Sequence, residues 1–309
     1  MPATQIRNQI RFLLNGEEMV LSDLRPDETL LDYLRLRRRL VGTKEGCAEG
    51  DCGACTVLVG RLARGDLVYE GVNACIRFLA SVDGCHVVTV EHLRGAEGAL
   101  HPVQQALVDH HGSQCGFCTP GFVMSLYALW MRNPQPSAHA IEKALQGNLC
   151  RCTGYEPIVK AAREISEYGT LEADFLVQER ASVAAKLEAL RDGARGEIGE
   201  GKDRLVIPAT ARDLAKVLEA EPRATVVAGA TDVGLWVTKF MREIAPVVFV
   251  GGIEELRHSS VQGGVLTIGA GVSYSEAFEM LSTHIPAIGR LIDRIGGDQV
   301  RNMGTIGGN

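Results

Sequence analysis

Three cysteines lie close together near the start of the sequence, and a fourth follows at a distance. Cys47, Cys52 and Cys55 are separated by four and then two residues, and Cys75 completes a C-x4-C-x2-C…C pattern. This is the plant-type ligand spacing of a [2Fe-2S] cluster. A structural zinc site is the alternative, but such sites commonly space their cysteines as two similar C-x2-4-C pairs, which this run of three does not match. The spacing therefore favours an iron–sulfur cluster, which transfers electrons.

The loop that carries these cysteines is rich in glycine, at Gly42, Gly46, Gly50 and Gly53. Glycine adopts positive φ without steric cost, so the backbone can turn its N–H groups towards negatively charged sulfurs. The composition of the loop thus agrees with a thiolate-bound cluster.

A second group of four cysteines follows the pattern C-x2-C…C-x-C and consists of Cys115, Cys118, Cys150 and Cys152. Each pair precedes a helix-start signal: Thr119 and Pro120 are typical of an N-cap followed by proline, and Thr153 with Glu156 matches a capping box. Free N–H groups and the helix dipole favour thiolates at such a place. Because C-x-C is an unusual pair for either metal, the spacing alone leaves iron–sulfur and zinc both open.

The composition sets limits on partners and location. The chain has 309 residues, a net charge of −6 and no basic tail, which argues against nucleic acid or an anionic membrane as a partner. We find no stretch of 18 apolar residues and no export signal, so we expect no membrane span and a cytoplasmic, thiol-reducing location. The ninth cysteine, Cys85, belongs to neither group and is interpreted as a small buried hydrophobe.

The elements around the first cysteine group predict a multidomain α+β chain that begins with a β-grasp ferredoxin domain over residues 1–93. Asn15-Gly16 separates two apolar stretches and predicts a hairpin of strands 10–14 and 19–21. Asp27 is the expected N-cap of a short helix through Leu34. Further strands are expected over 56–59, 67–69 and 87–90.

Helical patterns dominate the next part of the chain. An all-α helical-bundle domain is expected over residues 94–169, with helices over 102–110, 120–132, 137–146 and 156–168. Residues 170–204 contain one weak helix, over 182–190, followed by glycines among charged residues, and are interpreted as a linker.

The last part, residues 205–309, predicts an α+β domain that binds a phosphorylated ligand. Thr210 is expected to cap a helix to residue 220, and a buried strand over 225–228 runs into a glycine turn that opens another helix. The turn is not G-x-G-x-x-G, so a Rossmann fold is disfavoured. A second glycine-rich loop, over 301–309, ends the sequence, and we expect the domain to continue beyond it.

Three runs in this sequence, over residues 42–55, 113–121 and 147–155, resemble the iron–sulfur part of the molybdenum hydroxylases, the xanthine dehydrogenase family. The resemblance implies a second [2Fe-2S] cluster in the helical domain and FAD in the third domain. Two loops match those that hold the FAD diphosphate in the family, and they contribute Ala228, Gly229, Ala230, Thr231, Asp232, Val233, Thr305, Gly307, Gly308 and Asn309. For Asp232, a helix N-cap and a ribose or flavin contact remain open.

The same resemblance implies a partner. Two clusters and FAD on one chain are similar to the small subunit of bacterial family members, in which a separate large subunit holds the molybdopterin and the purine pocket. Electrons would pass from molybdenum to the second cysteine group, then to the first group, FAD and NAD. Gln114 matches a pterin contact and Cys152 the ligand nearest to it. A heterotetramer of two small and two large subunits is the implied assembly.

Three alternatives remain. The partner of such a chain can oxidise an aldehyde or an N-heterocycle in place of hypoxanthine and xanthine. A non-catalytic scaffold with two zinc sites would be colourless, whereas iron–sulfur protein is red-brown. A self-contained NAD(P)H–ferredoxin reductase is disfavoured because no Rossmann fingerprint occurs.

Overall fold

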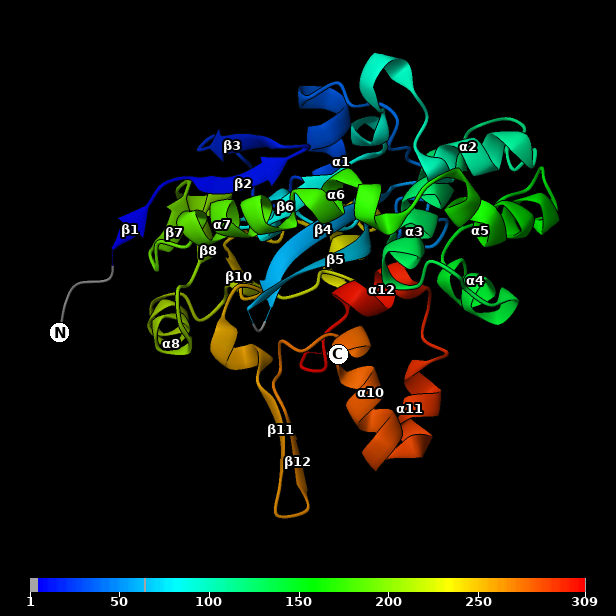
Figure 1. Cartoon of the computed structure of the whole chain (residues 1–309). Helices are drawn as coiled ribbons and strands as arrows, with labels where there is room; N and C mark the ends of the chain where they lie inside the picture. Colours follow the sequence, from blue (N-terminus) through cyan, green and yellow to red (C-terminus); the bar gives the residue numbers. More distant parts are fainter. Residues whose placement is uncertain (1–4, 64, 309) are drawn as a thin grey trace.

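The computed structural model describes residues 5–63 and 65–308, which contain two five-stranded sheets, a two-stranded hairpin and a set of helices (Figure 1). The first sheet has the strand order β3-β2-β6-β4-β5. Its strands are β2 (Ile10–Leu14), β3 (Glu17–Leu21), β4 (Thr56–Ala63), β5 (Asp66–Asn73) and β6 (His86–Val88). β2 pairs antiparallel with β3 and parallel with β6. This mixed sheet, with the short helix α1 (Leu30–Asp32), agrees with the predicted ferredoxin layout.

The hairpin at Asn15-Gly16 is confirmed. Both residues have positive φ, of 52° and 93°, as a tight two-residue turn requires. The predicted cap of α1 is wrong: the hydroxyl of Thr29 accepts a hydrogen bond from the N–H of Asp32 at 3.0 Å, while Asp27 forms an ion pair with Arg25. Threonine at 29 is the nearer polar side chain to the first helical turn, so it caps in place of Asp27.

Both faces of the first sheet are buried. Phe12, Leu14 and Val57 point into one core, which also includes residues of α1 and of the third domain. Leu13 and Leu58 point the other way, into a core formed with the helices. Because side chains alternate along a strand, neighbouring apolar residues in one strand anchor different layers.

The helical domain contains α2 (Pro102–Asp109), α3 (Thr119–Arg132), α4 (Ala138–Ala144) and α5 (Glu156–Tyr168), close to the predicted ranges. α3 lies against β4 and β5 and is buried on almost every side, including Phe122 and Trp130. It therefore joins the helical domain to the ferredoxin sheet (Figure 1).

The range interpreted as a linker is folded. It contains the predicted helix, α7 (Arg180–Leu190), but also the short α6 (Phe175–Gln178) and the strand β7 (Arg195–Ile198). Val183 and Leu187, four residues apart on α7, are buried in the core shared with the first sheet. Strand β1 (Ile6–Arg7) pairs in parallel with β7, so the start of the chain also joins this region. The sequence does not predict β7, because glycines in and around it leave too few apolar side chains for the alternating pattern of a strand to be recognised.

The third domain is built on the second sheet, with the order β1-β7-β8-β10-β9. Its other strands are β8 (Leu205–Ile207), β9 (Thr225–Val227) and β10 (Val247–Phe249), and α8 (Ala211–Ala220) is capped by Thr210 as predicted. β9 lies at the edge of the sheet and has one buried face: Val227 is 1% exposed, whereas Val226 is 44% exposed. The expectation of a buried strand is therefore confirmed for one face only.

The remaining elements of this domain complete the chain, and those after residue 258 lie below the ferredoxin sheet in Figure 1. They are α9 (Val233–Thr238), β11 (Ser259–Gln262), β12 (Val265–Ile268), α10 (Tyr274–His284), α11 (Pro286–Ile292) and α12 (Asp298–Met303). The β11–β12 hairpin extends away from the body of the molecule, whereas α12 packs on β5. Within the described residues, no helix has both the length and the hydrophobicity to cross a membrane.

Candidate metal centres and nucleotide site

The strand pairing of the first sheet brings the distant cysteine to the loop. Cys55 immediately precedes β4, and Ala74 alone separates Cys75 from the end of β5. The register of these strands places Thr56 opposite Asn73. The N–H of Ala74 donates to the carbonyl oxygen of Cys55 at 3.3 Å. The antiparallel pair therefore joins residues that are 20 positions apart in the sequence.

The four thiols of this first group lie in one run of contacts, in the order Cys52, Cys47, Cys75 and Cys55. Cys47 is hydrogen-bonded to Cys52 and to Cys75, and Cys55 is hydrogen-bonded to Cys75. The N–H groups of Asp51 and Cys52 both point at Cys47 Sγ, at 3.4 Å. The contacts with Cys52 and Cys75 lower the pKa of the Cys47 thiol, and the contact with Cys47 raises the pKa of each partner. N–H donors and paired thiols fit a two-iron cluster, which needs four thiolates.

The second group also forms two pairs, Cys118 with Cys150 and Cys115 with Cys152. Burial, and then the contact with Cys150, raises the pKa of Cys118 to about 12. The hydroxyl of Thr153 lies 3.1 Å from Cys150 Sγ. Among the described residues, no three Cys, His, Asp or Glu side chains converge as ligands of one ion. The two pairs of this group, like the run of four thiols in the first group, match the four donors that a two-iron cluster needs.

The cysteines of this group do lie at helix starts, but the predicted caps are wrong. Cys118 itself is the N-cap of α3, and Tyr155, with φ of 71°, is the N-cap of α5. Neither makes a side-chain capping bond. The Thr153 hydroxyl lies near the Cys150 sulfur and accepts from the N–H of Tyr155 at 3.2 Å, two residues on. It does not cap the first turn of α5, so the capping-box pattern misleads.

The two cysteine loops touch through their backbones. The N–H of Leu149 donates to the carbonyl oxygen of Cys52 at 3.0 Å. Gly53 has φ of +69°, and a Cβ built on it would lie 2.1 Å from the carbonyl oxygen of Gly147. A Cβ on Gly121 of α3 would lie 2.1 Å from the carbonyl oxygen of Gly53. Glycine at these positions permits the close approach of the loops.

The two glycine-rich loops of the third domain also meet. A Cβ on Gly229 would lie 1.6 Å from the carbonyl oxygen of Met303, so the first loop contacts the second one directly. The N–H of Gly307 donates to the carbonyl oxygen of Ala270 at 2.8 Å, which fixes the second loop to the turn after β12. Asp232 is the N-cap residue of α9 without a side-chain capping bond. Asn309 lies outside the described residues.

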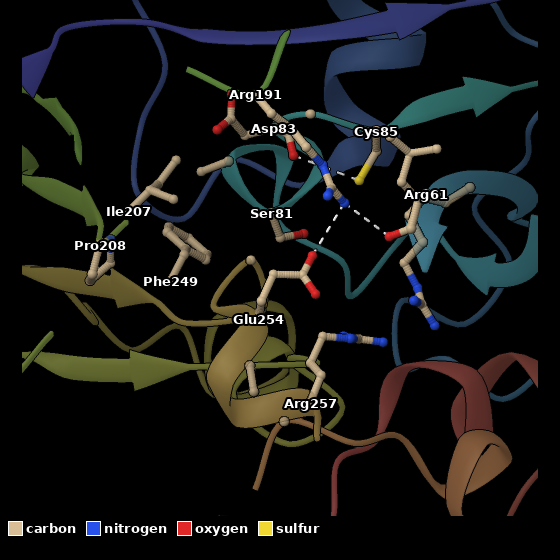
Figure 2. A pocket seen from close by; sticks show the side chains of 18 of the residues that line it. Arg61, Ser81, Asp83, Cys85, Arg191, Ile207, Pro208, Phe249, Glu254 and Arg257 are labelled. Carbon is tan, nitrogen blue, oxygen red and sulfur yellow. Dashed lines mark hydrogen bonds and ion pairs between the residues drawn. The ribbon is translucent and has the colours of Figure 1, made fainter. Parts of the chain in front are cut away.

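A cavity of about 330 Å³ opens beside these loops, between the first sheet and the third domain (Figure 2). Of the predicted nucleotide-binding residues, Ala228, Gly229 and Thr305 line it. Arg61 of β4 and Arg257, which follows β10 in the chain, also line it. The sequence holds no signal for these arginines, because they come from separate segments and form no local motif.

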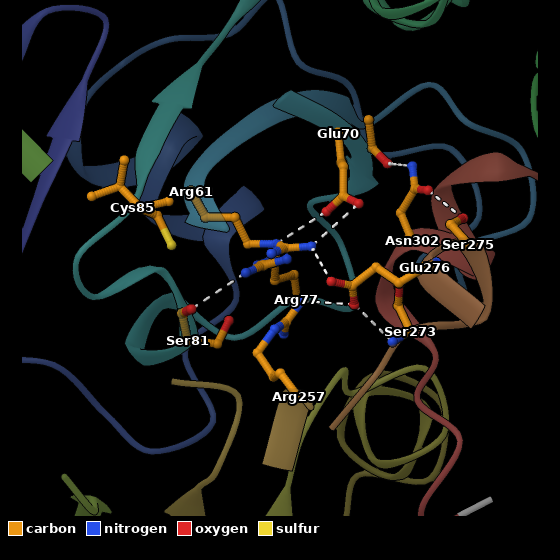
Figure 3. Close-up of polar contacts among 12 residues, drawn as sticks. Arg61, Glu70, Arg77, Ser81, Cys85, Arg257, Ser273, Ser275, Glu276 and Asn302 are labelled. Carbon is orange, nitrogen blue, oxygen red and sulfur yellow. Dashed lines mark hydrogen bonds and ion pairs between the residues drawn. The ribbon is translucent and has the colours of Figure 1, made fainter. Parts of the chain in front are cut away.

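The cavity wall contains a network of ion pairs. Arg61 pairs with Glu70 and Glu276 at 3.3 and 2.9 Å, and Arg257 pairs with Glu276 at 2.8 Å (Figure 3). Burial disfavours the Glu276 carboxylate, but the two arginines outweigh burial and lower its pKa to about 2. Glu276 therefore joins strand β4 electrostatically to the third domain.

Helix α9, which follows the first glycine loop, rests on the first cysteine group. A Cβ on Gly234 would lie 2.5 Å from the carbonyl oxygen of Ile76, next to Cys75. At the end of the helix, Lys239 Nζ donates to the carbonyl oxygen of Cys47 at 2.5 Å and pairs with Glu49 at 3.2 Å. One helix thus contacts both the nucleotide loops and the cysteine loop.

Three family models match the chain in this order. A 2Fe-2S iron-sulfur cluster binding domain matches residues 12–78, and a [2Fe-2S] binding domain matches residues 89–163. A FAD binding domain in molybdopterin dehydrogenase matches residues 200–309. The chain belongs to the molybdenum hydroxylase family. As a family member, it has two [2Fe-2S]-binding domains followed by a FAD-binding domain.

Relatives within the molybdenum hydroxylases are much longer than this chain. Xanthine dehydrogenase of Emericella nidulans is 32% identical over 354 residues, which cover 97% of this chain and 26% of the relative. Aldehyde oxidase 1 of Cavia porcellus is 35% identical over 351 residues, which cover 96% of this chain and 26% of the relative. The chain thus spans about a quarter of the length of these curated relatives, 26% in each case.

Solved structures of other family members are also similar. A chain of quinoline 2-oxidoreductase from Pseudomonas putida 86 is 35% identical, with a TM-score of 0.47, covering 52% of this chain and 93% of that one. The aldehyde oxidoreductase from Desulfovibrio gigas is 30% identical, with a TM-score of 0.45. The match covers 60% of this chain and 23% of that one.

Proposed function

We propose that this chain is the electron-transfer subunit of a xanthine dehydrogenase of the bacterial small-subunit type. Its eight clustered cysteines hold two [2Fe-2S] clusters, and the two glycine loops hold FAD. It carries electrons from molybdopterin in a large partner subunit to the second cysteine group, the first group, FAD and finally NAD, as hypoxanthine and xanthine are oxidised to urate.

The observation that carries this proposal is the contact between the two cysteine loops. The hydrogen bond from Leu149 to Cys52 joins the residue before Cys150 to a member of the first group. The clusters supply the redox chemistry when bound, and the chain sets their spacing and surroundings. Cys55 and Cys75 are buried, which limits the access of water to their side of the first group, whereas Cys47 and Cys52 are partly exposed.

The surface near the second group supports a large partner. Cys115 and Cys152 are exposed, as is Gln114, the candidate pterin contact. Phe117 and Leu149, beside the same cysteines, are 46% and 51% exposed. Apolar side chains gathered around a redox centre are suited to burial against another protein. The proposed assembly is two small and two large subunits.

The test is to add hypoxanthine anaerobically to the native complex, purified through this chain, and to follow the visible absorbance of clusters and flavin. Bleaching by hypoxanthine, and then reoxidation with NADH formation when NAD is added, is the expected result. Dithionite is the control. If dithionite bleaches a complex with intact molybdenum cofactor and hypoxanthine does not, the purine assignment is contradicted.

A second candidate function is the equivalent subunit of an aldehyde or N-heterocycle hydroxylase. The aldehyde oxidases of Cavia porcellus and Oryctolagus cuniculus are 35% and 33% identical to this chain, close to the 32% of the Emericella nidulans xanthine dehydrogenase. Because the substrate pocket would lie on the partner, the same anaerobic assay with aldehydes and quinoline distinguishes the two functions.

A further inference from the structure

We propose that Arg61, Arg77 and Arg257 bind the diphosphate of a dinucleotide in the cavity between the ferredoxin sheet and the FAD-binding domain. The three guanidinium groups converge from β4, from the turn after β5 and from the segment after β10 (Figure 3). The two glycine loops had been the only part of the sequence that indicated phosphate binding. The proposal is independent of the substrate that the partner subunit oxidises.

Arg77 is the group that most needs an anion. Within residues 5–63 and 65–308 it makes no ion pair, and its one side-chain hydrogen bond runs from Nη2 to the carbonyl oxygen of Ser81 at 3.3 Å. Its Nε is buried without a hydrogen-bond partner in this part of the chain. Burial lowers the pKa of Arg77; Cys85 and Glu70 oppose this, and Arg61 and Arg257 add to it. An unpaired guanidinium in such a place is costly, and a bound anion would compensate it.

The carboxylates of the cavity wall are already paired. Five arginines and four acidic residues line the cavity. Glu70 pairs with Arg61, Glu254 with Arg191 (Figure 2), and Asp83 with Arg7; Asp192 pairs with Arg7 and Arg11. Glu276 forms ion pairs with both Arg61 and Arg257. The charge of Arg77 therefore stays available to a ligand.

The shape and lining of the cavity suit a diphosphate. Its volume of about 330 Å³ lies at the lower end of the range for small-molecule sites. Planar guanidinium groups match phosphate oxygens with two parallel hydrogen bonds, and several converging arginines match a doubly charged diphosphate. Gly229 and Thr305, which line the same cavity, join it to the FAD loops. Two dinucleotides share this chemistry, FAD and NAD.

The experiment measures pyrophosphate binding by calorimetry to the native complex, once with FAD bound and once after FAD is removed. We expect Arg77→Met and Arg257→Met each to weaken pyrophosphate binding at least tenfold, and Arg77→Lys to weaken it less. Arg25→Met is the matched control, because Arg25 is a 73% exposed arginine in an ion pair with Asp27.

The two states of the complex identify the source of the diphosphate. Binding only to FAD-free protein, together with a higher dissociation constant for FAD in Arg77→Met, assigns the site to FAD. Binding to FAD-loaded protein that NAD competes away assigns it to NAD. Absence of binding in both states, or binding that neither Arg77→Met nor Arg257→Met changes, overturns the proposal. Because pyrophosphate binding is measured without turnover, its result does not depend on the outcome of the hypoxanthine assay.

Discussion

The backbone N–H of Leu149 donates a hydrogen bond to the carbonyl oxygen of Cys52, with the two atoms 3.0 Å apart. The contact brings together a residue beside the second cysteine group and a member of the first. Gly121 stands at the same junction, and a side chain there would meet the carbonyl oxygen of Gly53 at 2.1 Å.

Gly121→Ala should therefore separate the two clusters. We expect both clusters to assemble but the magnetic splitting between their reduced forms, measured by electron paramagnetic resonance at low temperature, to decrease because the coupling falls with distance. Gly252→Ala is the control, since a Cβ at Gly252 meets no atom within 4 Å. An unchanged splitting in Gly121→Ala would contradict the proposed contact.

Lys239→Met should lower the midpoint potential of the first cluster. The ammonium group of Lys239 lies against the Cys47 carbonyl, where a positive charge stabilises the reduced cluster. Because Lys239 is partly exposed, solvent screens its interaction with the cluster. Its loss should cost about 1 kcal/mol, which lowers the midpoint potential by on the order of 40 mV for one electron. A redox titration followed by electron paramagnetic resonance measures it. Lys239→Arg should keep the potential, and the second cluster serves as internal reference; equal shifts of both clusters would refute a local effect.

Cys75→Ser should remove the first cluster and leave the second. Serine is a poorer iron ligand than a thiolate, and Cys75 contacts both Cys47 and Cys55. Iron analysis should show a loss of about half the iron, since each [2Fe-2S] cluster holds the same number of irons. Cys85→Ser is the matched control, because Cys85 is also buried yet lies outside both groups. Retention of both cluster signals in Cys75→Ser would exclude Cys75 as a ligand.

Gln299→Ala should destabilise the junction of the three domains. Its Nε2 lies within hydrogen-bonding distance of Thr56, Ser125 and Asn148, at 3.1, 3.0 and 2.9 Å. Losing a buried amide leaves polar partners unsatisfied, at a cost of about 2 kcal/mol. Thermal unfolding and amide exchange near Asn148 measure the effect. Gln262→Ala, on the exposed end of β11, should change neither; equal behaviour of the two variants would show that the junction adds no stability.

Gly229→Ala should reduce the FAD content of the purified protein. A methyl group would lie 1.6 Å from the carbonyl oxygen of Met303 and would force the two glycine loops apart. The ratio of flavin to iron measures the loss while correcting for protein recovery. Gly71→Ala is the control, because Gly71 lies outside the cavity and a Cβ there meets only Thr56 Cγ2, at 3.5 Å. A full FAD content in Gly229→Ala would contradict the role of the loop contact.

The sequence correctly predicts a turn or a helix start where one short stretch of chain contains the whole pattern. Asn15-Gly16 predicts its hairpin, and Thr210 predicts the start of α8, because turn and cap chemistry acts over a few residues. The failures have the same origin. Thr153 satisfies a capping pattern yet turns to the Cys150 sulfur, and β7 hides among glycines because its partners β1 and β8 lie elsewhere in the sequence.

The sequence by itself determined the order of the domains, the family and the candidate cluster ligands, because cysteine spacing and glycine-rich loops are local properties of the chain. Only the tertiary structure decided which loops touch. The contacts of Leu149 with Cys52 and of Lys239 with Cys47 depend on how helices pack against the ferredoxin sheet. The arginine cavity likewise exists only because three separate segments converge, and no local pattern encodes such a meeting.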